Sequence, residues 1–354
     1  MAASSAPSAS PRDRIAGLDG LRAVAVLLVM ADHLITTMGY GSPNGANAFV
    51  AAGYGGVCVF FVISGFLITS LLLRERRASG RIDVGNFYMR RVLRIFPVFY
   101  GYILVLVLAR STGLLHFAWI ALVAPATFSR DFWGHSWVTA HFWSLSVEEQ
   151  YYLFWPAMLS YLGESGALKV ASTMLLAGPA IYVVVWHLGA PPLANWIVPE
   201  QFIAAGCVLA LFGDRLRARV LYRALLTGWG VAFTGLLAGA LILLAKGAGS
   251  TGGDLDIVAL AAAACALLPF LDGCMVLSLR GGLLNWKALV WVGTLSYSLY
   301  VWQQLFFRPS GVHRLPFPFD LAAAVVAAVA SSYLIERPFL RLRSRLRARV
   351  ASAV

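Results

Sequence analysis

Two ionisable residues stand out in the hydrophobic stretch 20–34: Arg22 and His33, which are eleven residues apart. At ~100° per residue, an α-helix returns the second residue to the face of the first after about three turns. A rise of ~1.5 Å per residue separates them by about 16 Å along the axis. Ionisable groups inside a membrane span are costly and usually face a bundle interior or a water-filled cavity. We therefore predict that Arg22 and His33 contact the two ends of one elongated ligand.

Both residues also have simpler interpretations. Arg22 fits a positive flank at the membrane edge, and His33 fits a hydrogen-bonded packing residue. Asp32, however, is adjacent to His33, and two neighbouring ionisable residues deep in one span favour a functional role. An imidazole with a pKa of ~6.5 suits a general base that works near neutral pH. His33 is therefore our candidate base, with Asp32 as a candidate catalytic residue that orients it.

A pair of carboxylates lies in the aromatic segment 141–156, HFWSLSVEEQYYLFWP, where Glu148 and Glu149 are side by side. If this helix begins at Phe142, Glu148 lies about 9 Å from its start, and His33 lies about 8 Å from the end of its own helix. We therefore expect a carboxylate at the depth of His33, where it would orient the imidazole or hold an acceptor in catalysis. The alternative is that both carboxylates only join helices through hydrogen bonds.

Three arginines are close together in FYMRRVLRIFP, residues 87–97. Arg90 and Arg94 share a helix face at i and i+4, and Arg91 is three residues from Arg94. Guanidinium groups suit phosphate oxygens, which predicts an anchor for a phosphorylated cytosolic ligand. A positive flank that only sets membrane orientation has the same pattern.

Further polar and aromatic residues could contact the substrate. Tyrosines near the end of the chain also fit an interfacial aromatic belt, so both interpretations stay open. Glycines in GYGGVCVFFVISGFLIT, including Gly56 and Gly65, are expected to let helices approach closely. The substrate-binding candidates are Trp143, Ser144, Tyr297, Tyr300 and Gln303.

Composition defines the class of protein. The chain has 354 residues, of which 60% are hydrophobic and 12% charged, and this indicates an all-α polytopic membrane protein. The net charge of +12 comes from arginines between apolar segments, where membrane orientation explains them, so we expect no nucleic-acid partner. The four cysteines have no metal-ligand spacing, and we expect no metal site.

About ten segments are long and apolar enough to span a bilayer as helices. Residues 114–128 are short and apolar, and the arginine clusters all face the cytosol only if this segment does not span. We therefore predict a transmembrane domain over 15–340 between a disordered cytosolic segment 1–14 and a basic cytosolic tail 341–354. The predicted spans are 21–38, 53–73, 91–109, 142–163, 168–188, 199–213, 224–245, 256–274, 288–306 and 321–335.

Six stretches occur in order along the chain: GLDGLRAVAVLLVMADHL, FFVISGFLIT, FYMRRVLRIFP, FWSLSVEEQYYLFWP, SYSLYVWQQ and ERPF. As a set they resemble the motifs of the membrane acyltransferase 3 family. The resemblance implies a bundle of about ten helices, in the cytoplasmic membrane of a bacterium, that moves an acyl group from acyl-CoA to a hydroxyl. The donor it implies is most often acetyl-CoA, a co-substrate, so no permanently bound cofactor is expected. The acceptor it implies is a glycan, a glycolipid or a secondary metabolite.

The resemblance also implies functional roles for residues already singled out. Arg22 and His33 match the family's arginine and histidine pattern, and the glutamate pair and the arginine cluster match its acidic and arginine motifs. Many members have a histidine after the tryptophan near the end, whereas here Gln303 follows Trp302. No catalytic role therefore passes to that position.

The expected mechanism is direct transfer. Donor phosphates would bind Arg22, Arg90, Arg91 and Arg94, and His33 would remove the acceptor's proton. Two alternatives stay open from sequence: a covalent acyl-enzyme on His33 or a serine, and a transporter or flippase that uses the buried charges as a substrate or proton path.

Overall fold

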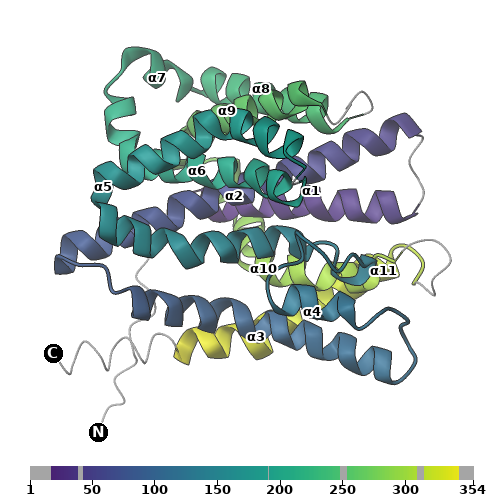
Figure 1. The fold of residues 1–354 in the computed structure, drawn as a ribbon. Helices are drawn as coiled ribbons and strands as arrows, with labels where there is room; N and C mark the ends of the chain where they lie inside the picture. Colours follow the sequence, from purple (N-terminus) through teal and green to yellow (C-terminus); the bar gives the residue numbers. More distant parts are fainter. Residues whose placement is uncertain (1–16, 39–42, 190, 248–252, 309–314, 343–354) are drawn as a thin grey trace, which may run out of the picture.

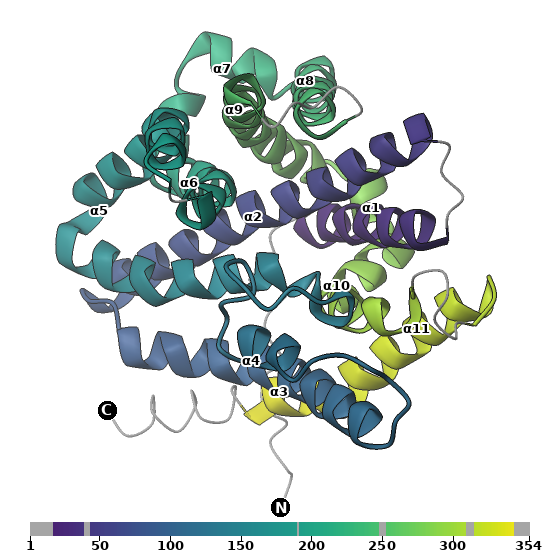
Figure 2. The ribbon, with the colours of Figure 1, turned by 45° about the vertical axis from the view of Figure 1, so that its right-hand side comes forward.

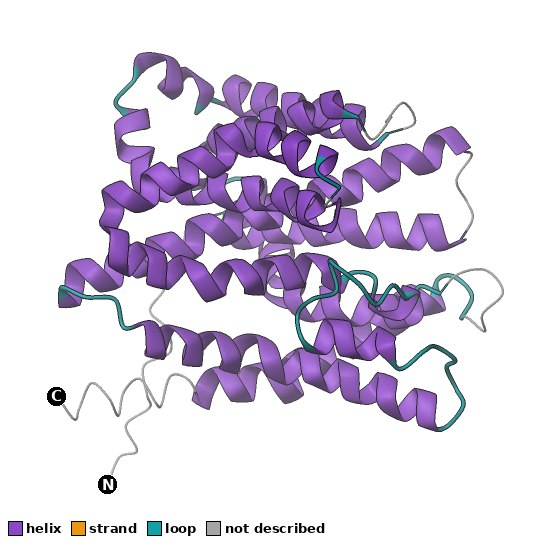
Figure 3. Cartoon of the chain, viewed as in Figure 1, coloured by secondary structure: helices purple, strands orange, loops and turns teal. Residues whose placement is uncertain are grey.

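The computed structural model describes residues 17–38, 43–189, 191–247, 253–308 and 315–342. Helices account for nearly all of this part of the chain, which contains no strand (Figures 1 and 3). The segment 1–14 and residues 343–354 of the basic tail lie outside the described residues. The helices are α1 (Leu18–Met38), α2 (Pro43–Ser79), α3 (Val84–Ser111), α4 (Ile120–Ala126), α5 (Phe142–His187), α6 (Pro191–Arg217), α7 (Val220–Leu225), α8 (Gly228–Lys246), α9 (Asp254–Ser278), α10 (Lys287–Phe306) and α11 (Phe319–Ser331), which continues into a π-helical turn (Ser332–Glu336).

Seven helices in the described residues are long and apolar enough to cross a membrane. They include α5 as one unit, although its backbone leaves helical geometry at Gly163, with φ of 68° and ψ of −177°. This break separates the two spans predicted at 142–163 and 168–188. Helices α1 and α10 have 21 and 20 residues, enough for a crossing, but they carry the polar residues described below. The count of ten spans and the cytosolic termini stay predictions.

The uncertain segment 114–128 contains only a seven-residue helix, α4. At ~1.5 Å per residue α4 is about 10 Å long, far less than the hydrocarbon thickness of a bilayer. The predicted span 224–245 is also shorter than expected, because α7 ends at Leu225 and α8 begins only at Gly228.

Helices α1, α2 and α10 form the centre of the bundle. Helix α1 packs against α2 on one side and α10 on the other, and α2 also packs extensively against α6. Helices α6 to α9 and the second half of α5 lie on one flank of this centre, and α3, α4 and α11 lie on the other, with the first half of α5 between α2 and α3 (Figure 2). The residues with candidate functions therefore lie on the innermost helices and on the two helices, α3 and α5, that face them.

Glycines let the central helices touch backbone to backbone. A Cβ at Gly56 of α2 would overlap the Ala25 carbonyl of α1, and a Cβ at Gly65 would overlap the Ile203 carbonyl of α6. Gly206 of α6 meets the Val62 carbonyl of α2 in the same way. These contacts confirm the prediction that small residues of the second span allow close helix approach.

Replacing Gly206 with alanine is expected to lower the free energy of unfolding by about 1–3 kcal/mol, because the new methyl group forces apart two backbones that cannot yield locally. Thermal unfolding of the detergent-purified protein measures this change. Gly239→Ala in α8 is the matched control, since nothing lies within 4 Å of its Cβ position. Equal stability of the two variants would contradict this view of the α2–α6 contact.

Candidate active site

Helix α1 carries Arg22 and His33 toward the same neighbour, α5. Arg22 interacts electrostatically with Glu148, and His33 interacts with His141, the residue directly before α5. The prediction that Arg22 and His33 share a helix face is therefore confirmed. We call the end of the bundle where Arg22 lies the arginine end, and the end where His33 lies the histidine end.

Charges of both signs converge at the arginine end. Glu148 of α5 interacts with Arg91 and Arg94 of α3 as well as with Arg22, and its carboxylate contacts the side chain of Ser64 on α2. The guanidinium carbon of Arg91 also lies 3.7 Å from the centroid of the Tyr152 ring, a cation–π contact. Four helices, α1, α2, α3 and α5, are thus joined by one charged cluster. We call Arg22, Arg91, Arg94 and Glu148 the arginine cluster.

Two other acidic residues border the arginine cluster. Glu149 interacts with Arg91, and Glu336 interacts with Arg22 and with Tyr297 of α10. Glu336 is 5% exposed, lies in the π-helical turn and accepts a hydrogen bond of 3.0 Å from Ser298. Sequence reasoning did not single out Glu336, although the ERPF motif contains it, and π-helical turns are frequent at functional sites.

Arg90 does not belong to the arginine cluster. Its Nη2 lies 2.7 Å from Oε2 of Glu75 on α2, an ion pair. A carboxylate from the preceding helix therefore already pairs with Arg90, and the phosphate-binding role predicted for Arg90 stays a prediction. Arg91 takes its place beside Arg94.

At the histidine end, His33 interacts with the side chain of Gln303 on α10. His141, only 1% exposed, has Nε2 3.2 Å from the Val301 carbonyl oxygen. The buried Nδ1 of His141 has no hydrogen-bond partner among the described residues. The hydroxyl of Tyr300 donates to the His141 carbonyl and lies 2.5 Å from Oγ of Ser144. We call His33, His141 and Gln303 the histidine cluster.

The expectation that Glu148 lies at the depth of His33 is wrong. The residue that interacts with His33 is His141, directly before α5, and Glu148 is seven residues further along, about 10 Å along the axis. The prediction assumed that α1 ends and α5 begins at one level, whereas α1 extends past the level at which α5 begins. His141 was missed because it precedes the apolar run, although it is the first residue of the aromatic segment.

A polar stripe on α10 connects the two clusters. Tyr297, Tyr300 and Gln303 follow one another at intervals of three residues, so they lie on one face of the helix. Tyr297 interacts with Glu148 and Glu149 and donates a hydrogen bond of 2.7 Å to the Ile95 carbonyl. Tyr300 lies midway, and Gln303 reaches His33.

The loop before α5 holds the start of that helix in place. The Arg130 backbone N–H donates to Oγ of Ser146 at 3.2 Å, and Gln150 Nε2 donates to Asp131 Oδ1 at 3.0 Å. Burial raises the pKa of the Asp131 carboxyl to about 6, although the hydrogen bond from Gln150 and the charge of Arg130 oppose the shift. These contacts hold the first turns of α5 in place, and with them His141 beside His33.

Asp32 and Trp143 lie on the side of the histidine end that faces α2. A Cβ at Gly53 would overlap the Asp32 carboxylate, so α2 packs directly on this side chain. The ring of Trp143 lies 6.1 Å from the ring of the next α2 residue, Tyr54, and nearly parallel to it. These contacts do not involve the His33 ring, so the orienting role predicted for Asp32 stays a prediction.

The seven helices that are long and apolar enough to span a membrane, together with the buried charged clusters, indicate a helical integral membrane protein. The sequence model of the acyltransferase 3 family, described as an acyltransferase domain, matches residues 15–337. The chain therefore belongs to the acyltransferase 3 family. No solved structure matches it.

Several curated relatives are similar to parts of the chain. The Bacillus subtilis protein named "Putative peptidoglycan O-acetyltransferase YrhL" is 30% identical over 325 residues, 81% of this chain and 48% of that protein. "Peptidoglycan O-acetyltransferase OatA" of Listeria monocytogenes is 31% identical over 163 residues, 42% of this chain and 24% of that protein. The Staphylococcus aureus protein named "Putative O-acetyltransferase SACOL0978" is 35% identical over 161 residues, 41% of this chain and 24% of that protein. The chain thus spans about half or less of the length of these relatives.

Proposed function

We propose that this domain is an O-acetyltransferase that moves an acetyl group from acetyl-CoA to a hydroxyl of a glycan, a glycolipid or a small molecule. The observation that carries the proposal is the polar stripe of α10, which joins the arginine cluster to the histidine cluster. The guanidinium groups of the arginine cluster suit the phosphates of the donor, and the histidine cluster suits an acceptor hydroxyl that loses its proton. The names of the relatives, peptidoglycan O-acetyltransferases, support acetyl as the transferred group and a glycan hydroxyl as the acceptor.

In the proposed mechanism the donor phosphates bind Arg22, Arg91 and Arg94, and the pantetheine arm extends along α10. His33 accepts the proton of the acceptor hydroxyl while the oxygen attacks the thioester carbonyl. The carbon–sulfur bond then breaks, and the proton on His33 passes to the leaving thiolate, which yields CoA and the acetyl ester. Gln303 orients the His33 ring, and Glu148 and Glu149 position the arginines.

The same proposal gives a membrane orientation. Acetyl-CoA is a cytosolic metabolite, so the arginine end faces the cytosol, and the histidine end faces the outer side of the cytoplasmic membrane of a bacterium. The cytosolic termini predicted from the arginine clusters agree with this orientation.

The test is acceptor-dependent release of thiol from acetyl-CoA by the purified protein. Replacing Arg94 with glutamine is expected to raise KM for acetyl-CoA by about tenfold or more, because a charge-assisted hydrogen bond to phosphate is lost. Arg90→Gln is the control, since Arg90 is paired with Glu75, and its KM should change by about twofold or less. A folded wild-type protein that binds no acyl-CoA would overturn the proposal in favour of transport.

A further inference from the structure

An apolar groove of about 410 Å³ lies on the outside of the bundle, between the second half of α5 and the helices α6, α7 and α9. It is open to the surroundings, because Leu176, one of its lining residues, is 72% exposed. Along α6 the lining residues run from Val208 to Leu216, which at ~1.5 Å per residue is about 12 Å. This length is close to half of the ~30 Å hydrocarbon thickness of a bilayer, so the groove extends through most of one leaflet.

The groove ends at the arginine end of the bundle. A Cβ at Gly17, directly before α1, would overlap the Ser278 side chain, so α9 ends beside the start of α1. Helix α6 ends at the same level, because Nε of Arg217 donates to Oδ2 of Asp272 on α9 at 3.1 Å. Figure 1 shows α7 at this end too, where α2 ends and α3 begins. By the positive-inside rule this end is expected to face the cytosol, which puts the groove in the cytosolic leaflet.

Arginines with free charge lie at this end of the groove. The guanidinium carbon of Arg215 is 5.6 Å from the centroid of the Phe212 ring, which lines the groove. Arg219 and Arg223 are exposed residues before and within α7, a helix that contributes two lining residues. Among the described residues, no carboxylate forms an ion pair with Arg215, Arg219 or Arg223. Their positive charge is therefore available to a ligand.

Arg217 differs from these three arginines because a buried carboxylate already neutralises it. Asp272 is 0% exposed and accepts hydrogen bonds of 3.1 Å from Nε of Arg217 and from the hydroxyl of Tyr222. Tyr222 itself lines the groove. These contacts join α6, α7 and α9, so they hold the cytosolic end of the groove in place.

The groove is complementary to a phospholipid with a net negative charge. One acyl chain fits an apolar groove that extends through one leaflet, and guanidinium groups donate hydrogen bonds to phosphate oxygens. Basic pockets between membrane helices on the cytosolic side bind anionic headgroups in this way. A zwitterionic phospholipid has the same chains but no net charge, so the arginines should distinguish the two kinds of lipid.

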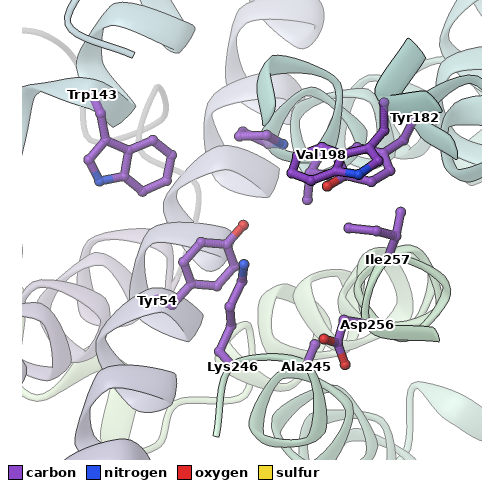
Figure 4. A pocket seen from close by; sticks show the side chains of 10 residues that line it. Tyr54, Trp143, Tyr182, Val198, Ala245, Lys246, Asp256 and Ile257 are labelled. Carbon is purple, nitrogen blue, oxygen red and sulfur yellow. The ribbon is translucent and has the colours of Figure 1, made fainter. Parts of the chain in front are cut away.

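A cavity of about 380 Å³ between α2, α5, α6, α8 and α9 has a different character (Figure 4). Aromatic residues line it, including Tyr54, Trp143 and Tyr182. Its charged lining residues are one basic and one acidic residue, Lys246 and Asp256. This cavity therefore has no excess of positive charge for a lipid phosphate, and the groove is the better site for an anionic lipid.

We propose that the groove between α5, α6, α7 and α9 binds a phospholipid of net negative charge from the cytosolic leaflet. One acyl chain lies against Phe212 and Leu176, and the phosphate binds Arg215. The site is independent of the proposed acetyl transfer, because no residue of the arginine cluster or the histidine cluster lines it. Failure of either proposal leaves the other standing.

Cys265 lines the groove and serves as a reporter of its occupancy. It is exposed, whereas Cys58, Cys207 and Cys274 are buried. The full chain is purified in detergent, and phosphatidylglycerol or phosphatidylcholine with identical acyl chains is added. The rate at which a maleimide alkylates Cys265 is followed by intact mass. Cys265→Ser should abolish this alkylation, which shows that the signal comes from the groove.

Half-maximal protection of Cys265 should require at least about fivefold less phosphatidylglycerol than phosphatidylcholine, because one arginine beside an anionic headgroup strengthens binding by about this factor. Arg215→Gln should reduce the preference by about fivefold. Arg280→Gln is the matched control, since Arg280 is an exposed arginine directly after α9 that does not line the groove. This control should keep the preference of the wild-type protein.

A second variant tests the apolar part of the groove. Leu176→Trp fills space that the acyl chain would occupy, so both lipids should require about fivefold or more to reach half-maximal protection. Leu236→Trp is its control, because Leu236 is 75% exposed on α8 and does not line the groove. Half-maximal concentrations that match in the two variants would place the lipid elsewhere and overturn the proposal.

The headgroup tests have equally definite outcomes. Equal protection by the two lipids in the wild-type protein, protection by neither, or an unchanged preference in Arg215→Gln would overturn the proposal. Glycerol 3-phosphate, a headgroup without acyl chains, should give no protection. Protection by glycerol 3-phosphate at the concentrations at which phosphatidylglycerol protects would show that a phosphate alone occupies the site, and would also overturn the lipid site.

Discussion

Replacing His33 with alanine is expected to lower kcat for acceptor-dependent transfer by about 10²–10⁴-fold, the usual contribution of a general base. The imidazole lies at the meeting point of α1, α5 and α10, next to His141 and Gln303. His33 is the ionisable residue of α1 that meets the polar stripe at its histidine end, through Gln303. Steady-state release of thiol from acetyl-CoA measures the effect.

The binding of acetyl-CoA should survive the loss of His33. The donor phosphates are proposed to bind about 16 Å away at Arg22, so the dissociation constant should change by about twofold or less. His116→Ala is the control, because His116 is an exposed residue of the loop before α4. Transfer at the wild-type rate in His33→Ala would exclude His33 as the base, and a labelled acyl group retained on the wild-type protein without acceptor would favour a covalent acyl-enzyme.

Replacing Glu148 with alanine is expected to lower the free energy of unfolding by on the order of 3 kcal/mol. The substitution removes the negative charge that neutralises part of the positive charge of Arg22, Arg91 and Arg94 in the protein interior. The same carboxylate joins α5 to α1, α2 and α3. The measurement is the midpoint of thermal unfolding in detergent. Glu148→Gln keeps the shape and the contact with Ser64, so its loss of stability should be smaller.

Glu164→Ala provides the control for Glu148, since Glu164 is exposed and lies just past the break at Gly163 in the same helix. Its unfolding midpoint should match that of the wild-type protein. If Glu148→Ala were as stable as this control, the arginine cluster would not hold the four helices together.

The sequence was sufficient to predict features that follow from periodicity within one helix. The eleven-residue interval between Arg22 and His33 placed both residues on the α5 side of α1, and the spacing of Tyr297, Tyr300 and Gln303 produces the polar stripe of α10. The 3.6-residue repeat alone determines such relations.

Relations between helices were harder to predict. The level of Glu148 depends on where α5 begins relative to α1, and the partner of Arg90 depends on the rotation of α3 against α2. Side-chain packing across each contact determines both, and one sequence does not reveal that packing.

The backbone contacts of α1 have a consequence for which donors can react. This helix touches α2 at Gly56 and α10 at Gly293, where a Cβ would overlap the Asp19 carbonyl, so it is held on both sides and cannot slide. The interval between Arg22 and His33 is set by the continuous helix that carries both residues, and the contacts with α2 and α10 fix the position of that helix in the bundle. If the proposed donor path is correct, we expect a thioester whose arm is shorter than pantetheine to reach only one of the two residues, so that truncated donors react poorly.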